Sequence, residues 1–598
     1  MRFLKYSLAA GAAVALSGCI GDGTDSVLQS AAAVAPAPAV TPTPAMPAAD
    51  QGRVATTQGI PTGNVIFMHP DGTGLSHWAA HRMYFHGLDG TSNWDLLPQM
   101  AVYRGHLENL VAGTSHGSAT THAFGFKVDA FGSFGMDGDG NLNPPTNRPI
   151  NSLSGFRGSL MREAANAGIP VGVVNDGHVG EPGTGAFLAE VGNRDNWQEI
   201  TRQMILGRTG MNDTAPWVIM GGGEADALPA GATTLHRNVN QERGATAPNL
   251  RLSLRTDDLN LIDAWNRMGS GNASNDPAQR DDFIVVRTRA EFESLRQALA
   301  ANPTYAPRVL GLFAFQDTFN DRNEQDLINR GFVRAGVAPG TIGPAPFKQS
   351  RLVLWGDHDA AEPGFNPPTF AEMTEVTLTI LNRAAASRTQ PEQRRFFLVA
   401  EQESIDNFGN NTNAIGMLHA MQDTDRALGA ALNFQRSAGN ERTLILTAAD
   451  SDAGNMTVLS GENVVPAGSP RSGILPPGTA PNITGTVTSN PSAAPTTGTT
   501  PPSTAVTNFV DGVEGRQSPM FVTEPDQFGN RMQFGIIWPG SADYHGGILS
   551  RAAGLNAGML NSHFSARFDN IDVYRMKHAT LFGRLLAYPT ATMAPTRP

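Results

Sequence analysis

Cysteine is almost absent from this sequence, because Cys19 is the only one among 598 residues. A chain with one cysteine cannot form an internal disulfide, so its stability must come from the packed core and from any metals that it binds. No internal repeat or heptad pattern occurs either, and this excludes solenoid and coiled-coil architectures.

Basic clusters and long apolar runs are also missing. Lys and Arg number 43 against 54 Asp and Glu, which gives a net charge of −11, and the cationic residues form no cluster that could follow a phosphate backbone. A nucleic-acid partner is therefore not expected, and an anionic substrate would need positive charge from metals or from an arginine. Beyond the amino terminus, no apolar segment is long enough to cross a membrane.

The amino terminus is typical of an export signal. A basic start precedes a short apolar run, and Leu16-Ser17-Gly18-Cys19 resembles the lipobox of a bacterial lipoprotein. We expect residues 1–19 to be a signal peptide, with cleavage before Cys19, acylation there, and a lipid anchor in the periplasm or outer membrane as the only membrane contact. A plain secretory peptide is the alternative.

Two segments have compositions that do not favour a folded core. Residues 20–59 are rich in Ala, Pro and Thr and are predicted to be a tether, because such sequences bury little apolar surface. Residues 455–520 are rich in Pro, Gly, Thr and Ser and are predicted to be a low-complexity surface insertion. Residues 60–590 are then one catalytic domain that contains this insertion.

Within that domain, apolar runs alternate with amphipathic stretches. VIFM precedes a helical pattern over residues 76–86, PVGVV precedes one over 196–206, and FFLVA precedes one over 414–434. This alternation predicts an α/β fold with a mostly parallel central sheet and helices on both faces.

Acidic residues end three of the expected strands. Asp71 follows VIFM, Glu401 ends FFLVAE, and Asp450 follows TLILTAA. Because the carboxyl ends of parallel strands lie at one edge of a sheet, these side chains can converge on a site for hard cations. A hydrolase with several metal ions is the first hypothesis.

Several segments in order along the chain support a family resemblance. NVIFMHPDGTG, SHGSATTHAFGFK, AFLAEVGNR, PPTFAEMTEVTLTIL, EQESID and DYHGGI together resemble the alkaline phosphatase family. The resemblance implies that family's sandwich of helices around a sheet, a serine nucleophile beside two zinc ions and one magnesium ion, small phosphate esters as substrates, and a homodimer.

The nucleophile position falls on Ser115. The segment Gly125-Phe126-Lys127 fixes the alignment and places Ser115 where the family's serine begins a helix. There a metal could activate the hydroxyl while the amides of the first helical turn favour an anion. Ser118 is the reserve candidate, and Thr114 stands where the family has an aspartate.

The resemblance also supplies the other site residues. Arg194 aligns with an arginine that grips phosphate, and Glu181 with a magnesium-ligating aspartate, while the next hydroxyl ligand of the family aligns with Gly183, one residue before Thr184. The remaining metal positions fall on Asp71, Glu401, Asp406, Asn410, Asp450, Ser451 and His545.

Two histidines of the family are replaced here, by Asn410 and Ser451. Amide and hydroxyl oxygens suit Mg²⁺, Ca²⁺ or Mn²⁺ better than Zn²⁺, so we expect divalent metals with Mg²⁺ at one position and Zn²⁺ or Ca²⁺ at the others. Asp452, His116 or His122 could supply a substitute ligand.

The sequence therefore predicts a metal-dependent phosphomonoester hydrolase that acts through a phosphoserine. A phosphodiesterase or sulfatase-like hydrolase on the same fold is one alternative. A noncatalytic, metal-stabilised protein that binds a surface polymer or a partner is another.

Overall fold

The computed structural model describes the greater part of the predicted catalytic domain. The described residues are 56–130, 132–138, 147–238, 251–269, 282–319, 366–460, 474–475, 511–512, 515–516, 520–540 and 542–589. The predicted signal peptide (1–19), nearly all of the tether (20–59) and most of the insertion (455–520) lie outside them. Among the described residues, no helix combines the length and apolar character needed to span a bilayer.

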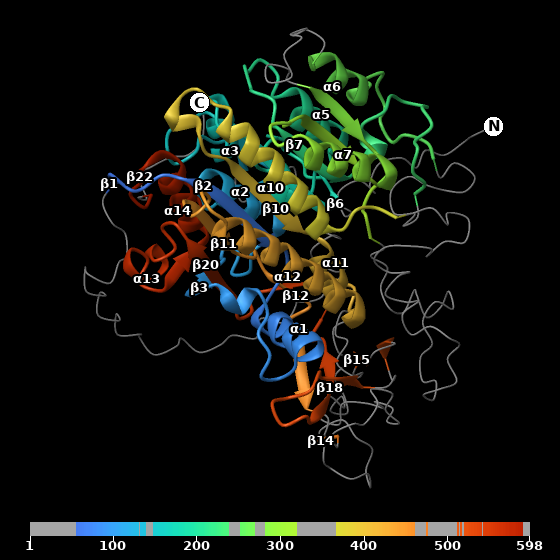
Figure 1. The fold of residues 1–598 in the computed structure, drawn as a ribbon, viewed down its shortest axis with the longest axis vertical. Coiled ribbons are helices and arrows are strands. Elements are labelled where there is room, and N and C mark those ends of the chain that lie inside the picture. The colour runs from blue at the N-terminus through green and yellow to red at the C-terminus, as the bar shows by residue number, and fades with distance from the viewer. Residues whose placement is uncertain are drawn as a thin grey trace, which may run out of the picture.

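A large sheet runs through the centre of the molecule (Figure 1). Within the described ranges it has ten strands in the spatial order β21 (Arg567–Asp569), β3 (Gln99–Arg104), β20 (Leu549–Gly554), β11 (Thr443–Thr447), β2 (Asn64–Pro70), β10 (Phe397–Gln402), β6 (Val171–His178), β7 (Val218–Gly222), β9 (Arg308–Leu312) and β8 (Phe283–Val286). The run from β11 to β8 is parallel, whereas β20 is antiparallel to both of its neighbours. The predicted mostly parallel sheet is confirmed.

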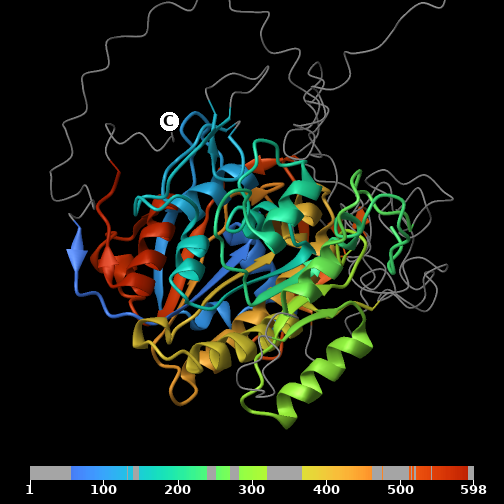
Figure 2. The same ribbon diagram turned by 90° about the horizontal axis from the view of Figure 1, so that it is seen from above.

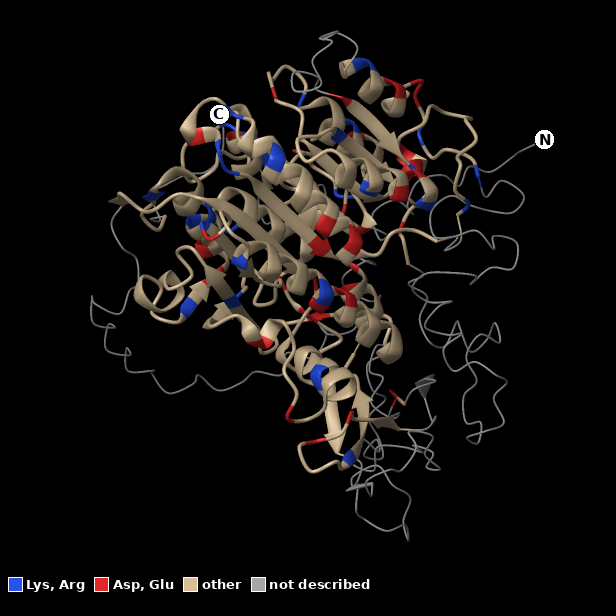
Figure 3. Ribbon diagram, in the orientation of Figure 1, with Lys and Arg blue, Asp and Glu red and all other residues tan. Residues whose placement is uncertain are grey.

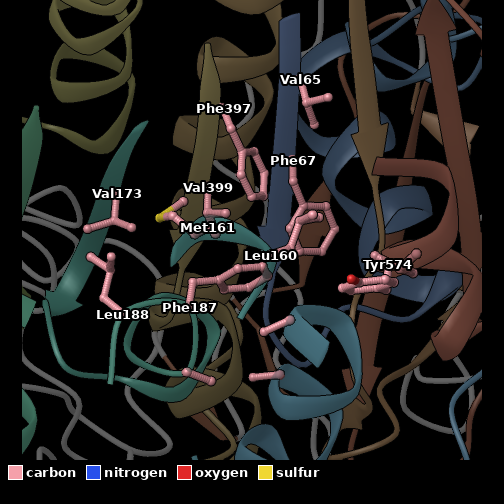
Figure 4. Close-up of a cluster of buried hydrophobic side chains, with 14 of the residues drawn as sticks. Val65, Phe67, Leu160, Met161, Val173, Phe187, Leu188, Phe397, Val399 and Tyr574 are labelled. Carbon is pink, nitrogen blue, oxygen red and sulfur yellow. The ribbon is translucent and has the colours of Figure 1, made fainter. Parts of the chain in front are cut away.

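The central strands are apolar on both faces. In β2, Val65 and Phe67 pack into one core cluster, while Ile66 and Met68 pack into a second cluster on the opposite face. This follows from the twofold alternation of side chains along a strand, and it explains why β2 is a continuous apolar run. Figure 4 shows Phe67 beside Phe397 and Phe187 in the first cluster.

Helices cover both faces of the sheet (Figure 2). The first core cluster includes residues of α2 (Ser115–Phe124), α3 (Leu160–Asn166), α5 (Trp197–Leu206) and α14 (Asn570–Phe582). The second includes residues of α1 (Leu75–His86), α7 (Arg289–Ala301), α10 (Phe370–Ala386) and α12 (Ala414–Arg436). Three of these helices, α1, α5 and α12, lie within two residues of the predicted ranges, and the α/β fold class is confirmed.

A smaller sheet lies at the flanks of the predicted insertion. β13 (Thr457–Ser460) and β15 (Asp511–Gly512) both pair antiparallel with β18 (Arg531–Ile537). At the other end of the domain, the last residues of the predicted tether include β1 (Thr57–Gln58), which pairs with β22 (Arg584–Leu585). Both ends of the predicted insertion thus pair with β18, a strand outside it.

Candidate metal centre and nucleophile

Asp71 lies at the carboxyl end of β2 and is fully buried. The chain turns directly after it through Gly72, whose φ of 64° is readily available only to glycine. The Gly72 N–H donates to Asp450 Oδ1 over 3.1 Å, so the turn after β2 is tied to the residue that follows β11. No N–H or hydroxyl group donates to either oxygen of Asp71, whose carboxyl group lies next to that of Asp450.

Glu401 lies near the end of β10, the strand beside β2. Its Oε1 accepts the Gly183 N–H over 2.9 Å, and its Oε2 accepts from the Asn175 side chain over 2.5 Å and from the Thr184 hydroxyl over 3.2 Å. Gly183 and Thr184 belong to the short helix α4 (Pro182–Gly185). Thr184 therefore brings its hydroxyl to this carboxylate, although the aligned position falls on Gly183.

Two groups of potential ligands share Asp71. One consists of His69, Asp71 and Asp450, and the other of Asp71, Glu401 and Glu403, with the ligand atoms of each group within 4.8 Å of one another. All five side chains are buried. Asp71 can therefore contribute one oxygen to each group, as a carboxylate that bridges two cations does.

Asp406 extends this cluster on one side. It lies in α11 (Ser404–Asn410), and a Cβ on Gly72 would be only 2.7 Å from its Oδ1. The Asn410 amide donates to both oxygens of Asp406, over 3.1 and 3.0 Å, and to Asp543 Oδ1 over 3.0 Å. The structure thus joins Asp406 and Asn410 and adds Asp543 to them, while metal binding by Asp406 and Asn410 stays a prediction.

Ser451 and His545 differ in their placement. Ser451 is buried beside Asp450, and its hydroxyl has no hydrogen-bond partner. His545 is exposed on the loop after β19 (Asp543–Tyr544), while Asp543 and Gly546 of the same segment contact the acidic residues Asp406 and Asp452. The loop therefore reaches the cluster, and ligation by His545 stays a prediction.

Ser115 is the first residue of α2 and is 2% exposed. The preceding Thr114 caps this helix, because its hydroxyl accepts the Gly117 N–H over 3.3 Å. Gly113 lies against the Asp450 carbonyl and against the Ser118 hydroxyl, which leaves no room there for a side chain. The helix start that carries both candidate nucleophiles thus packs against the acidic cluster.

Arg194 is the positive charge of this region. Its guanidinium lies 3.5 Å from Glu181 Oε2. Burial raises the pKa of Glu403 and of Asp406 well above the usual range, and the charge of Arg194 acts in the opposite direction on both. The same charge lowers the pKa of His116 in α2, so Arg194 is near both the acidic cluster and the nucleophile helix.

The acidic cluster is electrostatically unfavourable in the absence of cations. Burial and the neighbouring Asp450 raise the pKa of Asp71, and burial and Glu181 raise the pKa of Glu401. Figure 3 shows acidic segments gathered near the centre of the molecule, beside α11. Bound cations would reverse these shifts by favouring the ionised carboxylates.

The donor atoms fit the metals that the sequence predicted. Buried oxygens without hydrogen-bond partners occur on Asp71, Asp450, Glu403 and Ser451. Carboxylate and hydroxyl oxygens suit Mg²⁺, Mn²⁺ and Ca²⁺, and a histidine within the cluster also allows Zn²⁺. Divalent metals are therefore compatible with the cluster.

Sequence reasoning missed His69, Glu403 and Asp543. His69 and Glu403 lie within two residues of predicted ligands, so the strand-end rule could have included both. Asp543 is distant in sequence from Asp406, and only the pairing of β19 with β12 (Asp452–Ala453) brings it close. Among the suggested substitute ligands, His122 instead pairs with the Tyr103 hydroxyl over 2.8 Å.

Comparison with known proteins places the chain in a family. A family model described as alkaline phosphatase matches residues 62–467. The tissue-nonspecific alkaline phosphatase of Mus musculus is 23% identical over 385 residues, which cover 62% of this chain and 59% of that protein. The alkaline phosphatase of Escherichia coli is 23% identical over 403 residues, covering 65% of this chain and 70% of that protein.

Solved structures agree on the fold. The alkaline phosphatase of Thermus thermophilus superposes with a TM-score of 0.54 at 16% identity, covering 92% of this chain and 97% of that one. The chain spans about three fifths of the length of the mouse relative. With the family model matching well over half of its residues, the chain belongs to the alkaline phosphatase family.

Proposed function

We propose that this protein is a metal-dependent phosphomonoester hydrolase that acts through a phosphoserine on Ser115. The observation that carries the proposal is the buried carboxylate Asp71, which is shared by two ligand groups and receives no hydrogen bond from an N–H or hydroxyl group. Unpaired buried charge is costly, so such a group supports the binding of cations, and the helix start that carries Ser115 packs against the same cluster. Small phosphate esters are the proposed substrates.

Different residues of the chain would have separate roles in the reaction. Ser115 Oγ attacks phosphorus, the bond from phosphorus to the leaving oxygen breaks, and the leaving alcohol takes a proton. Divalent cations at the carboxylates would favour the ionised hydroxyl and neutralise the charge of the phosphoryl oxygens. Arg194 supplies two parallel N–H donors to those oxygens, and water then hydrolyses the phosphoserine to release phosphate and restore Ser115.

The start of α2 supports this role for Ser115. The amides of a first helical turn and the positive end of the helix dipole favour an anion there. The Thr114 hydroxyl accepts the Gly117 amide and its carbonyl accepts the Ser118 amide, so the amides of Ser115 and His116 are the ones offered to a phosphoryl group. Because the recognised group is the phosphoryl itself, the site demands little of the leaving group, and broad monoester specificity follows.

Hydrolysis assays with three classes of ester distinguish the proposed function from its alternatives. The purified protein with its native metals should hydrolyse p-nitrophenyl phosphate faster than bis(p-nitrophenyl) phosphate and p-nitrophenyl sulfate. Faster turnover of the diester or of the sulfate would identify the corresponding alternative. Absence of turnover on all three, in protein that is folded and retains its metals, would favour the noncatalytic alternative.

The nucleophile is tested by a pair of variants. Ser115→Ala should abolish p-nitrophenol release, whereas Ser118→Ala, one turn along the same helix, should retain most of it. Acid quenching during turnover should trap a phosphoryl group on the peptide that contains Ser115, detectable by mass spectrometry. Retained turnover in Ser115→Ala, with loss in Ser118→Ala, would assign the nucleophile to Ser118.

A further inference from the structure

His69 is a buried histidine beside the acidic cluster, and the family resemblance assigns it no role. It lies in β2, and the parallel register pairs it with Glu401 of β10. Since side chains alternate along a strand, His69 and Glu401 project from the same face as Phe67 and Val399. The register of two neighbouring strands therefore holds an imidazole and a carboxylate side by side.

The ring is oriented by one hydrogen bond. His69 Nδ1 lies 2.8 Å from the Ala448 carbonyl oxygen, and a carbonyl can only accept, so Nδ1 carries the proton. The other nitrogen, Nε2, then presents a lone pair. A backbone carbonyl that fixes the tautomer in this way is the usual second partner of a metal-binding histidine.

The lone pair of Nε2 points into the acidic cluster. Nε2 is fully buried and has no hydrogen-bond partner, and it lies 3.8 Å from Asp71 Oδ1 and 4.0 Å from Glu401 Oε1. A lone pair that faces carboxylate oxygens is unfavourable unless a cation lies between them. Both separations are shorter than about 4.2 Å, twice a typical metal–ligand distance, so one ion can contact His69 together with either carboxylate.

The short helix α4 leaves space for this ring at Gly183. A Cβ on Gly183 would lie well under 3.0 Å from His69 Cδ2 and from Glu401 Oε1. Glycine at this position, where the family has a hydroxyl ligand, is therefore required by the imidazole and the carboxylate that fill the space. The glycine at residue 183 and the histidine at residue 69 therefore fit together sterically, and a side chain at residue 183 would displace the histidine.

We propose that His69 binds, through Nε2, the divalent cation held by Asp71 and Asp450, with which it forms one of the two ligand groups. It supplies from β2 the imidazole that the chain lacks at Ser451. The inference rests on the metal requirement of the proposed function. Metal binding can nevertheless be measured without turnover, so the two proposals can fail separately.

The test uses the full-length protein, stripped of metal and reconstituted with Mn²⁺, whose ligands include both oxygen and imidazole nitrogen. Pulsed electron paramagnetic resonance should show coupling to ¹⁴N that changes to the ¹⁵N pattern when the histidines are labelled with ¹⁵N. Made together with His545→Gln, which removes the other predicted imidazole ligand, His69→Gln should remove this coupling and weaken Mn²⁺ binding at least about tenfold relative to His545→Gln alone, because loss of an outer partner of a ligand already costs 10–100-fold.

His578→Gln is the matched control. His578 is also buried and also pairs through Nδ1 with a backbone carbonyl, that of Arg584 over 2.9 Å, but it lies in α14 and is not among the clustered ligands. This variant should retain both the nitrogen coupling and the Mn²⁺ affinity. Coupling that is absent from the wild type, or that survives in the folded double variant His69→Gln/His545→Gln, would overturn the proposal.

Two further variants keep the test decisive if His69→Gln does not fold. Coupling that persists in both His545→Gln and His122→Gln supports His69, whereas its loss in either one assigns the nitrogen to that residue and overturns the proposal. Nitrogen coupling in a protein that hydrolyses no ester would contradict the proposed function alone. Phosphomonoester hydrolysis without nitrogen coupling would contradict the role of His69 alone.

Discussion

Replacing Gly183 by alanine should disrupt the metal centre, because the added methyl group has no free space. Its Cβ would fall well under 3.0 Å from Glu401 Oε1 and from His69 Cδ2. The backbone itself would tolerate alanine, since Gly183 is not among the glycines with positive φ. Any effect must therefore come from displacement of these two side chains.

The expected cost follows from what holds Glu401. Its Oε1 must retreat by roughly 1 Å to reach an ordinary contact distance, and this lengthens the 2.9 Å hydrogen bond from the Gly183 N–H beyond useful range. Losing a hydrogen bond to a charged group costs about 1.5–3 kcal/mol, and crowding a packed site costs about 1–3 kcal/mol. We expect a loss of about 3 kcal/mol in the free energy of unfolding and at least about a tenfold loss of metal affinity.

The measurement is denaturant unfolding of metal-loaded protein, combined with titration of metal into stripped protein. Gly558→Ala is the control, because no atom lies within 4 Å of a Cβ built there and its φ is −59°. That variant should be neutral or slightly stabilising. If Gly183→Ala matched Gly558→Ala in both stability and metal affinity, the crowded arrangement of Glu401 and His69 around residue 183 would be refuted.

Three other predictions concern charge and metal preference. Burial raises the pKa of Asp423 to about 6 from 3.8, so wild-type stability relative to Asp423→Asn should fall by about 2 kcal/mol as the pH rises from 4 to 7, measured by urea unfolding; a constant difference would contradict this. Chelation should lower the melting temperature more at pH 8 than at pH 5. The pKa values of Asp71 and Asp406 are raised in the folded protein, so the metal-free protein loses stability as the pH rises. Calorimetry that shows an equal loss of melting temperature at both pH values would contradict this prediction. Asn410→His should raise the affinity for Zn²⁺ relative to Mg²⁺ in competition titrations, because it adds an imidazole beside Asp406, and unchanged selectivity would place the bound metal elsewhere.

The convergence of the strand-end acids could be predicted from sequence because it depends on a general property of parallel sheets. Asp71, Glu401 and Asp450 end three strands that lie side by side as β2, β10 and β11. Apolar runs identify such strands, and the strand ends then fix which side chains share an edge. The family resemblance was needed for Ser115 and Arg194, since a helix start or a loop arginine carries no comparable signal.

The remaining residues depend on register and on packing, which one sequence does not reveal. His69 faces the site only because β2 and β10 pair in the register that sets it beside Glu401, and a shift by one residue would turn it to the opposite face. The clash that requires glycine at residue 183 likewise becomes visible only when α4 is packed against both strands. The substitution that removes a hydroxyl group from the motif makes room for the imidazole of His69.

The negative charge of the acidic cluster explains why its carboxylate groups favour bound cations. The buried carboxylates of the cluster are Asp71, Glu401, Glu403, Asp406 and Asp450. Two ionised groups about 4 Å apart repel by about 4 kcal/mol at an effective dielectric constant near 20. Without cations, part of the cluster takes up protons instead, as the raised pKa values of Asp71, Glu401 and Asp406 indicate. The guanidinium of Arg194, which also pairs with Glu181, cannot offset five carboxylates, whereas divalent cations among them would offset most of their charge. Under the proposed function, a chain with a single cysteine would gain both catalytic charge and part of its stability from the same ions.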